Sequence, residues 1–403
     1  MNAVGIDVSK GKSMVAILRP YGEIISTPFE IKHTSSDINA LVEQIKSVDG
    51  ESRIVMEHTG RYYEVLAHQL SQANLFVSAV NPKLIKDFDN DSLRKVKSDK
   101  ADAVKIARYA LDKWQNLKQY SVMDEVRNQL KTMNRQFGFY MKHKTAMKNN
   151  LIGILDQTYP GVNTYFDSPA RSDGSQKWVD FASTYWHVDC VRKMSLIAFT
   201  DHYQKWCKRN KYNFSQAKAE EIYGTAKELV PVLPKDEVTK LIIKQAVDQL
   251  NSASATVESL RSLMNETAAK LPEYPIVMEM KGVGPSLGPQ LIAEIGDVTR
   301  FHSKGALTAF AGVDPGVNES GTYAQKSVPT SKRGSADLRK TLFQVMDALI
   351  KTMPQDDPVY MFLDKKRAQG KPYYVYMTAG ANKFLRIYYG RVNEYLSTLP
   401  ESN

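Results

Sequence analysis

The sequence has few cysteines and no long apolar run, and each absence excludes a class of protein. Its 403 residues include only Cys190 and Cys207, too few for a disulfide framework or a cysteine-rich zinc module but compatible with a reducing cytosol. No apolar run reaches the roughly 18 residues that a transmembrane helix needs. The N-terminal stretch MNAVGIDVSKGK lacks the apolar segment and cleavage site of a secretory signal. We therefore expect a cytoplasmic protein.

The sequence also lacks the usual nucleotide-binding and zinc-protease motifs. It contains neither a G-x-x-x-x-G-K-[ST] loop nor a G-x-G-x-x-G turn, and its 7 histidines show no H-E-x-x-H spacing. These motifs place backbone amides on phosphates, or two imidazoles on one zinc ion. Ordinary nucleotide-dependent and zinc-dependent enzymes are therefore disfavoured.

Positive charge is present in excess. Lysine and arginine number 54 against 44 acidic residues, a net charge of +10, and 42% of the residues are hydrophobic. This composition is that of a globular protein, and the length predicts two or three domains. The basic excess favours a polyanionic partner, with nucleic acid the first candidate.

The first 120 residues predict a mixed α/β domain. Short apolar runs at 3–8, 13–18 and 24–31, separated by turn residues, are typical of an antiparallel meander. A strand at 52–56, a helix at 62–72 and a strand at 76–80 follow. Such an order predicts a mixed sheet covered by helices.

The middle of the chain predicts two long helices. Apolar residues recur at alternating spacings of three and four from 124 to 155 and again from 243 to 271. This spacing is typical of a coiled coil, between the two helices or with a partner chain, and two core helices of a bundle are the alternative. The segment 156–234 between them, which holds Trp178, Trp186 and Trp206, is expected to be a folded insert. Residues 272–403 are expected to be mostly helical.

Four acidic residues of the first domain stand where strands end or a helix begins. Asp7 lies in the apolar run GIDV, Glu57 ends the strand IVME, and Asp99 and Asp102 are three apart, which places them on one face of a helix. A lone carboxylate in an apolar strand is costly unless it is paired or bound to metal. Mg²⁺ prefers such oxygen ligands, and two ions about 3.5–4 Å apart promote phosphodiester chemistry. The pattern therefore predicts a metal-dependent phosphodiester site.

Two other interpretations of these acids remain open. Asp7 opposite the turn SKGK is also compatible with the phosphate-loop acid of an actin-like sugar kinase. Asp99 and Asp102 are equally compatible with a solvated helix face paired with neighbouring lysines.

Further motifs favour contact with a nucleic-acid backbone. The glycines of GVG, Gly282 and Gly284, resemble the hairpin of a helix-hairpin-helix element, where backbone amides approach a DNA phosphate, although an ordinary helix–helix turn is equally plausible. The segment 309–340 combines turn residues with a basic edge. Its Ser320 has no histidine nearby in the sequence, so from the residues alone a turn serine is favoured over a nucleophile.

Another set of basic residues follows one side of the first long helix, and we expect no acid near it. This side is either a track for a nucleic-acid backbone or a solvated face. The candidate nucleic-acid-binding residues are Arg127, Lys131, Arg135, Lys142, Lys144, Lys148, Gly282, Gly284, Lys326, Lys332, Arg333 and Arg339.

In combination, the motifs resemble those of the DEDD transposases of bacterial insertion sequences, the bridge-RNA-guided recombinases, with the Piv-type DNA invertases as close relatives. The motifs are GIDVSK, EHTGRYYE, NPKLIKDF followed by KSDKADAVKIA, GVGP, and AFAGVDP…ESG…SKRG…LRK. Their order and spacing cover nearly the whole chain except the insert at 156–234, whose aromatic residues form a small core or stack on RNA.

The resemblance implies a domain plan and a mechanism. Residues 1–120 would be a RuvC-like domain with an RNase H fold, whose tetrad Asp7, Glu57, Asp99 and Asp102 binds Mg²⁺ or Mn²⁺. Residues 121–271 would be a coiled-coil region for dimerisation, with tetramers as the larger assembly, and 272–403 a transposase domain in which Ser320 is the nucleophile. A covalent phosphoserine would conserve the bond energy for rejoining DNA strands.

The resemblance also implies partners. Donor and target DNA would be chosen by a structured guide RNA through base pairing, in the cytoplasm of a bacterium and close to the nucleoid. The alternatives are a Piv-like invertase without guide RNA, a junction-resolving metal-dependent nuclease that uses water, and a non-catalytic nucleic-acid scaffold.

Overall fold

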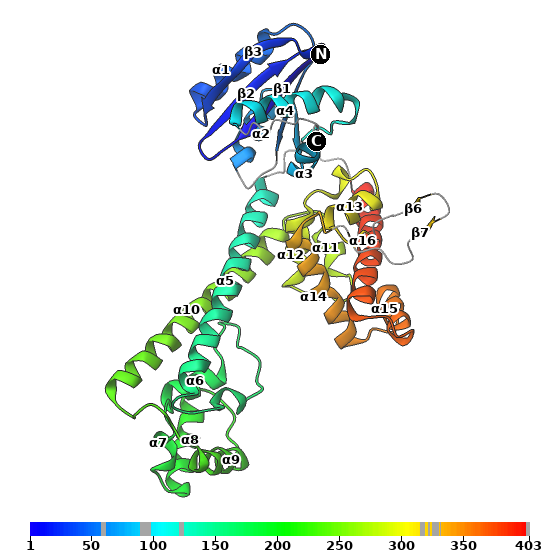
Figure 1. Cartoon of the computed structure of the whole chain (residues 1–403). Coiled ribbons are helices and arrows are strands. Elements are labelled where there is room, and N and C mark those ends of the chain that lie inside the picture. The colour runs from blue at the N-terminus through cyan, green and yellow to red at the C-terminus, as the bar shows by residue number, and fades with distance from the viewer. Residues whose placement is uncertain are drawn as a thin grey trace. The chain divides into compact units, whose positions relative to one another are not determined.

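The computed structural model describes most of the chain (Figure 1). The described residues are 1–57, 62–88, 98–120, 125–314, 319–320, 323–324, 330 and 332–399, with only the backbone given at 83, 319–320 and 323–324. The chain divides into two compact units, Met1–Val122 and Met123–Asn403. Each unit has hydrophobic cores of its own.

A five-stranded mixed sheet forms the centre of the first unit. Its order is β3-β2-β1-β4-β5, with antiparallel pairs β1–β2 and β2–β3 and parallel pairs β1–β4 and β4–β5. The strands are β1 (Asn2–Val8), β2 (Lys12–Leu18), β3 (Ile24–Lys32), β4 (Ser52–Glu57) and β5 (Phe76–Val80). The expected mixed α/β fold, with a meander followed by alternating helices and strands, is confirmed.

Helices cover both faces of this sheet. They are α1 (Ser35–Ser47), α2 (Tyr62–Gln72), α3 (Pro82–Asp87) and α4 (Asp99–Asp112). Val4 and Ile6 of β1 share a core with α1 and α2, whereas Ala3 shares a core with α4. Because side chains alternate along a strand, Asp7 lies on the same face as Ala3, towards α4. The sheet thus places Asp7 on the side of the helix that carries Asp99 and Asp102.

Two long helices organise the second unit. They are α5 (Glu125–Leu155) and α10 (Glu237–Ala268), which lie side by side in Figure 1. The Lys144 Nζ is 3.9 Å from a carboxylate oxygen of Glu258, and the Arg261 guanidinium lies 5.8 Å from the centre of the Phe137 ring. These contacts pair the two helices in an antiparallel sense. The helices predicted from the three–four spacing therefore pair with each other within one chain.

The segment between these helices folds around an aromatic core. It contains a 3₁₀ turn at Val162–Thr164 and the helices α6 (Lys177–Thr184), α7 (Asp189–Arg192), α8 (Leu196–Arg209) and α9 (Gln216–Glu228). Trp178, Trp186 and Trp206 are at most 8% exposed and belong to this core, together with Leu151 of α5 and Leu250 of α10. Of the two interpretations of the aromatic residues, the structure supports the core.

In the described part of the second unit, the remaining elements are helices and the two short strands of one hairpin. They are α11 (Tyr274–Met278), α12 (Leu287–Ile295), α13 (Lys304–Ala311), β6 (Glu319–Ser320), β7 (Tyr323–Ala324), α14 (Ala336–Thr352), α15 (Pro358–Ala368) and α16 (Tyr373–Thr398). Their core includes Leu130 of α5 and Val257 of α10. The helix pair is therefore embedded in one core at each end.

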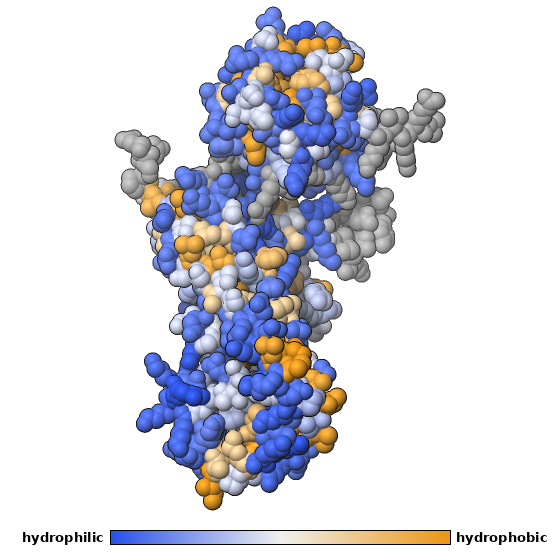
Figure 2. Space-filling model, turned by 90° about the vertical axis from the view of Figure 1, so that its left-hand side faces the viewer, coloured by the Kyte–Doolittle hydropathy of each residue, from blue (hydrophilic) through white to orange (hydrophobic). Residues whose placement is uncertain are grey.

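The face drawn in Figure 2 is largely hydrophilic, with apolar patches. Three exposed valines, Val230, Val232 and Val238, lie near the start of α10, and each is at least 68% exposed. Within the described ranges, no helix is both long and apolar enough to cross a membrane.

Candidate active site

The sheet and one helix bring the four predicted acids into the same region of the first unit. Asp7 lies near the carboxyl end of β1, and Glu57 is the last residue of the neighbouring parallel strand β4, with Ile6 opposite Met56 in the register. Asp99 and Asp102 occupy the first turn of α4, where the Ser98 hydroxyl accepts a hydrogen bond from the amide of Ala101 at 3.3 Å. A helix N-terminus favours negative charge, so this position stabilises both carboxylates.

The pKa values show that these acids affect one another. Burial, and then the charges of Asp102 and Asp99, raise the pKa of Asp7 to about 6. Burial also raises the pKa of Glu57, with further contributions from Asp7 and Asp102 that Lys105 partly offsets. Carboxylates that repel one another in a half-buried site are typical of functional sites.

The donor set fits a hard divalent cation in kind. All four groups are carboxylates, the ligand type that Mg²⁺ prefers, and a cation would relieve the repulsion that raises the pKa of Asp7. Within the described part of the chain, no three acidic, histidine or cysteine side chains are close enough together to form a ligand group. The four acids therefore influence one another electrostatically, but their side chains do not lie close enough together to form a complete metal-ligand group.

Ser320 belongs to the other unit. Its backbone pairs with Tyr323 in the hairpin of β6 and β7. Lys326, the other predicted site residue of this hairpin segment, lies outside the described residues. The basic residues that follow differ from one another: Lys332 and Arg333 are exposed, whereas the Arg339 guanidinium donates to the carbonyl oxygens of Ala311 and Gly334, at 3.0 and 3.1 Å.

Several basic residues of α5 are paired with acids from distant parts of the chain. The buried Arg127 forms a two-pronged ion pair with Glu273. Arg135 pairs with Glu294 and Asp337. The expectation that this helix side has no acid nearby is wrong, because Glu273 lies just before α11, Glu294 in α12 and Asp337 in α14. The ion pair with Glu273 therefore holds Arg127 in the interior of the unit.

The other basic residues of α5 are more accessible. Lys142 and Lys148 are exposed, and Lys131 is partly exposed. Burial lowers the pKa of Lys144, although the nearby Glu258 opposes the effect. Lys142 and Lys148 are the members of this set best placed to meet a ligand from solvent.

The two glycines of the GVG turn have different surroundings. Gly282 has φ +75, and a Cβ added to it would lie 2.8 Å from Leu349 Cγ, so its lack of a side chain allows the turn to pack on α14. A Cβ on Gly284 would have no atom within 4 Å. Packing therefore explains Gly282, and only Gly284 leaves room for an approaching phosphate.

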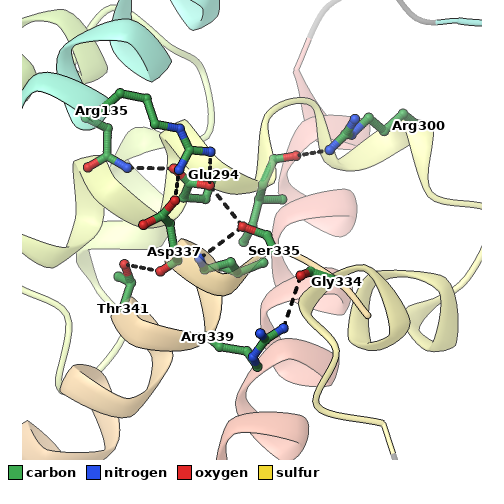
Figure 3. Close-up of polar contacts among 11 residues, drawn as sticks. Arg135, Glu294, Arg300, Gly334, Ser335, Asp337, Arg339 and Thr341 are labelled. Carbon is green, nitrogen blue, oxygen red and sulfur yellow. Dashed lines mark hydrogen bonds and ion pairs between the residues drawn. The ribbon is translucent and has the colours of Figure 1, made fainter. Parts of the chain in front are cut away.

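Sequence reasoning missed the polar network around Glu294 (Figure 3). Glu294 is 4% exposed and accepts hydrogen bonds from Asn134, Arg135 and Ser335 at 2.8, 2.9 and 3.1 Å. One signal was available: a single acid within the apolar helix segment LIAEI. Its three partners lie far from it in the sequence.

Comparison with known proteins places the chain in a family. Residues 4–160 match the family model of the DEDD transposases of the IS110 type, and residues 274–360 match a model described as the transposase IS116/IS110/IS902 family. The chain belongs to the DEDD transposases of insertion sequences. The first match contains the four acids and the second contains Ser320, and neither covers most of the insert.

Individual relatives are distant. The chain is 22% identical to an uncharacterized 43.6 kDa protein of insertion element IS110 from Streptomyces coelicolor, over 68% of this chain and 65% of the relative. It is 21% identical to an uncharacterized 44.8 kDa protein of insertion element IS116 from Streptomyces clavuligerus, over 79% and 77%. It is 23% identical to the pilin gene-inverting protein of Moraxella bovis, over 85% and 80%. The chain thus spans just under two thirds of the first relative and about four fifths of the last.

Proposed function

We propose that this member of the family is an RNA-guided DNA recombinase that cleaves and rejoins strands through a covalent phosphoserine at Ser320. In this proposal Asp7, Glu57, Asp99 and Asp102 hold Mg²⁺, or Mn²⁺, in a RuvC-like domain. The observation that carries it is the cluster of mutually repelling carboxylates at the ends of β1 and β4 and the start of α4, within the region that matches the family.

The chemistry follows from the residues proposed to take part. The Ser320 Oγ attacks a DNA phosphorus, forming a Ser–O–P bond as one P–O bond of the strand breaks. The serine proton passes to a base, the departing deoxyribose oxygen acquires a proton, and no oxidation or reduction occurs. A bound divalent ion would stabilise the charge that develops on the phosphate. Reversal with a different strand end rejoins the DNA without a high-energy cofactor.

DNA and guide RNA require basic, accessible surfaces. Lys142 and Lys148 on α5, and Lys332 and Arg333 before α14, are exposed and supply this charge; we include Lys131, Lys326 and Gly284 in the same proposal. Assembly into dimers or larger oligomers is also proposed, and the exposed apolar residues at the start of α10 support it.

The test is covalent capture of the protein on DNA from the ends of its element. Wild type with Mg²⁺ is expected to give a protein–DNA adduct that resists denaturant, whereas Ser320→Ala gives none and still binds DNA. Thr322→Ala removes a neighbouring hydroxyl and is the matched control. Strand cleavage by Ser320→Ala without an adduct would instead support hydrolysis by water, as in a junction-resolving nuclease.

A second candidate is an invertase without guide RNA, which the similarity to pilin gene-inverting proteins favours. Sequencing RNA that copurifies with the protein separates the two. A single defined RNA encoded beside the gene is expected. Adduct formation by protein freed of all RNA, at the rate of the untreated sample, would favour the invertase.

A further inference from the structure

The described residues on the two sides of the segment that carries Ser320 meet between the end of α13 and the start of α14. The amide of Ser335 donates to the carbonyl of Phe310 at 2.8 Å. The Arg339 guanidinium joins the two sides, since its Nη1 donates to the carbonyl oxygen of Ala311, the last residue of α13, and to that of Gly334 on the returning side. We call this arrangement the loop base and define it by Phe310, Ala311, Gly312, Gly334, Ser335 and Arg339.

Two glycines make this close approach possible. Gly312 has φ +64, and a Cβ added to it would lie 2.7 Å from the Nη1 of Arg339 and 2.9 Å from the amide nitrogen of Gly334. A Cβ on Gly334 would collide with the carbonyl of Phe310. Only residues without side chains allow the two backbones to pass this closely. The close crossing of the two backbones therefore depends on glycine at both positions.

A buried carboxylate fixes the returning side. The Ser335 hydroxyl donates to Glu294 at 3.1 Å and accepts a hydrogen bond from the amide of Leu338, capping α14 (Figure 3). Glu294 also binds Asn134 and Arg135 of α5, and Arg135 pairs with Asp337 in the first turn of α14. Burying a carboxylate is unfavourable unless its oxygens accept hydrogen bonds or ion pairs. Here both oxygens have donors, which ties the loop base to α5 and α12.

Closure of the loop base bears directly on the proposed chemistry. Ser320 lies in the hairpin between Gly312 and Gly334. Phosphoryl transfer requires the attacking oxygen to be in line with the leaving oxygen, and a misplacement of about 1 Å lowers the rate by about 100-fold. Joining the ends of a segment removes conformations that it would otherwise sample. A closed base therefore limits where Ser320 is presented.

We propose that Arg339 is a positioning residue for Ser320, acting through closure of the loop base, and that it does not contact DNA phosphate. This inference rests on the proposed role of Ser320. It assigns Arg339 a role different from the phosphate contact that its place in a basic segment predicts. The half-buried side chain and its two backbone partners, both on the loop base, support this assignment.

The experiment compares Arg339→Met with Lys351→Met, an equal loss of charge at an exposed position later on the same helix. Full-length protein is assayed for rate of adduct formation, for DNA affinity over a range of salt, and for hydrogen exchange of peptides covering 309–313 and 333–338. Arg339→Met is expected to lower the adduct rate at least 10-fold and to accelerate exchange in both peptides. Its DNA affinity and the salt slope are expected to match those of Lys351→Met. Arg339→Lys, which retains one donor group, is expected to recover part of the adduct rate.

Other outcomes overturn the proposal. Arg339 would be a phosphate contact if Arg339→Met bound DNA more weakly and if the slope of log affinity against log salt concentration fell in magnitude by about one. Unchanged exchange in Arg339→Met would show that the guanidinium does not close the base. If Arg339→Met is poorly folded, Arg339→Lys is judged by the same criteria. An adduct that persists in Ser320→Ala would refute the proposed nucleophile alone, because the exchange measurements test closure independently.

Discussion

At the scale of single residues, Asp7 is an acid whose ionisation is opposed by its surroundings. Its pKa of about 6 lies above its ordinary value of 3.8 because of burial and the charges of Asp102 and Asp99. As pH rises, the unfolded chain therefore loses this proton before the folded protein does. The free energy of unfolding is expected to fall between about pH 4 and pH 6 and to remain lower above that window.

Asp7→Asn removes this effect. Without divalent ions at pH 8, the variant is expected to be more stable than wild type by about 1 kcal/mol, after allowance for the screening of a half-exposed group. Urea unfolding of the first unit in EDTA, measured from pH 4 to pH 8, checks the prediction. Asp49→Asn, at an exposed position, is the control and is expected to follow wild type. A profile for Asp7→Asn that matches wild type would show that Asp7 titrates normally.

At the scale of elements, the contact between β1 and α4 sets the place of two of the four acids. A Cβ on Gly5 would collide with the backbone of Ala103 and Ala107 in α4. Gly5→Ala is therefore expected to push α4 away from the sheet, carrying Asp99 and Asp102 with it, and to destabilise the first unit by about 1–3 kcal/mol. The second consequence is checked by measuring the melting temperature over a range of Mg²⁺ concentrations. The rise in melting temperature expected on Mg²⁺ binding should be smaller for Gly5→Ala than for wild type.

Gly153→Ala is the matched control for Gly5→Ala. Gly153 is exposed within α5, and a Cβ there would meet nothing within 4 Å. Alanine is expected to stabilise this helix by about 0.5–1 kcal/mol and to leave the Mg²⁺ response unchanged. A Gly5→Ala protein with a normal Mg²⁺ response would show that α4 can shift without disturbing the cluster.

The main elements were predictable because their signals are local in the sequence. Short apolar runs bounded by turn residues identified the strands, and the three–four spacing identified α5 and α10. The partners of α5 were not predictable, since Glu273 and Glu294 lie well over a hundred residues from Arg127 and Arg135. Ser335 had no local signal for its bond to Glu294 either. The four acids were placed correctly on strand ends and a helix start, but their mutual effect on pKa depends on tertiary contacts.

At the scale of the whole molecule, separate cores predict separate unfolding. Leu66 is fully buried in the first unit and Trp206 is 1% exposed in the insert. Leu66→Ala is expected to cost about 2–5 kcal/mol and Trp206→Ala about 3–5 kcal/mol. In differential scanning calorimetry, each substitution should lower the midpoint temperature of one unfolding transition and leave that of the other unchanged. A single transition that shifts with both would mean that the units unfold cooperatively.

The antiparallel pair of α5 and α10 has a consequence for how such a protein can vary in evolution. Because each end of the pair is embedded in a different core, the middle can lengthen or shorten while both cores keep their contacts. Adding seven residues to each helix preserves the packed faces and separates the two cores by about a further 10 Å. The spacing between the insert and the transposase-matched helices is thus a property that insertions and deletions of paired heptads can adjust in steps.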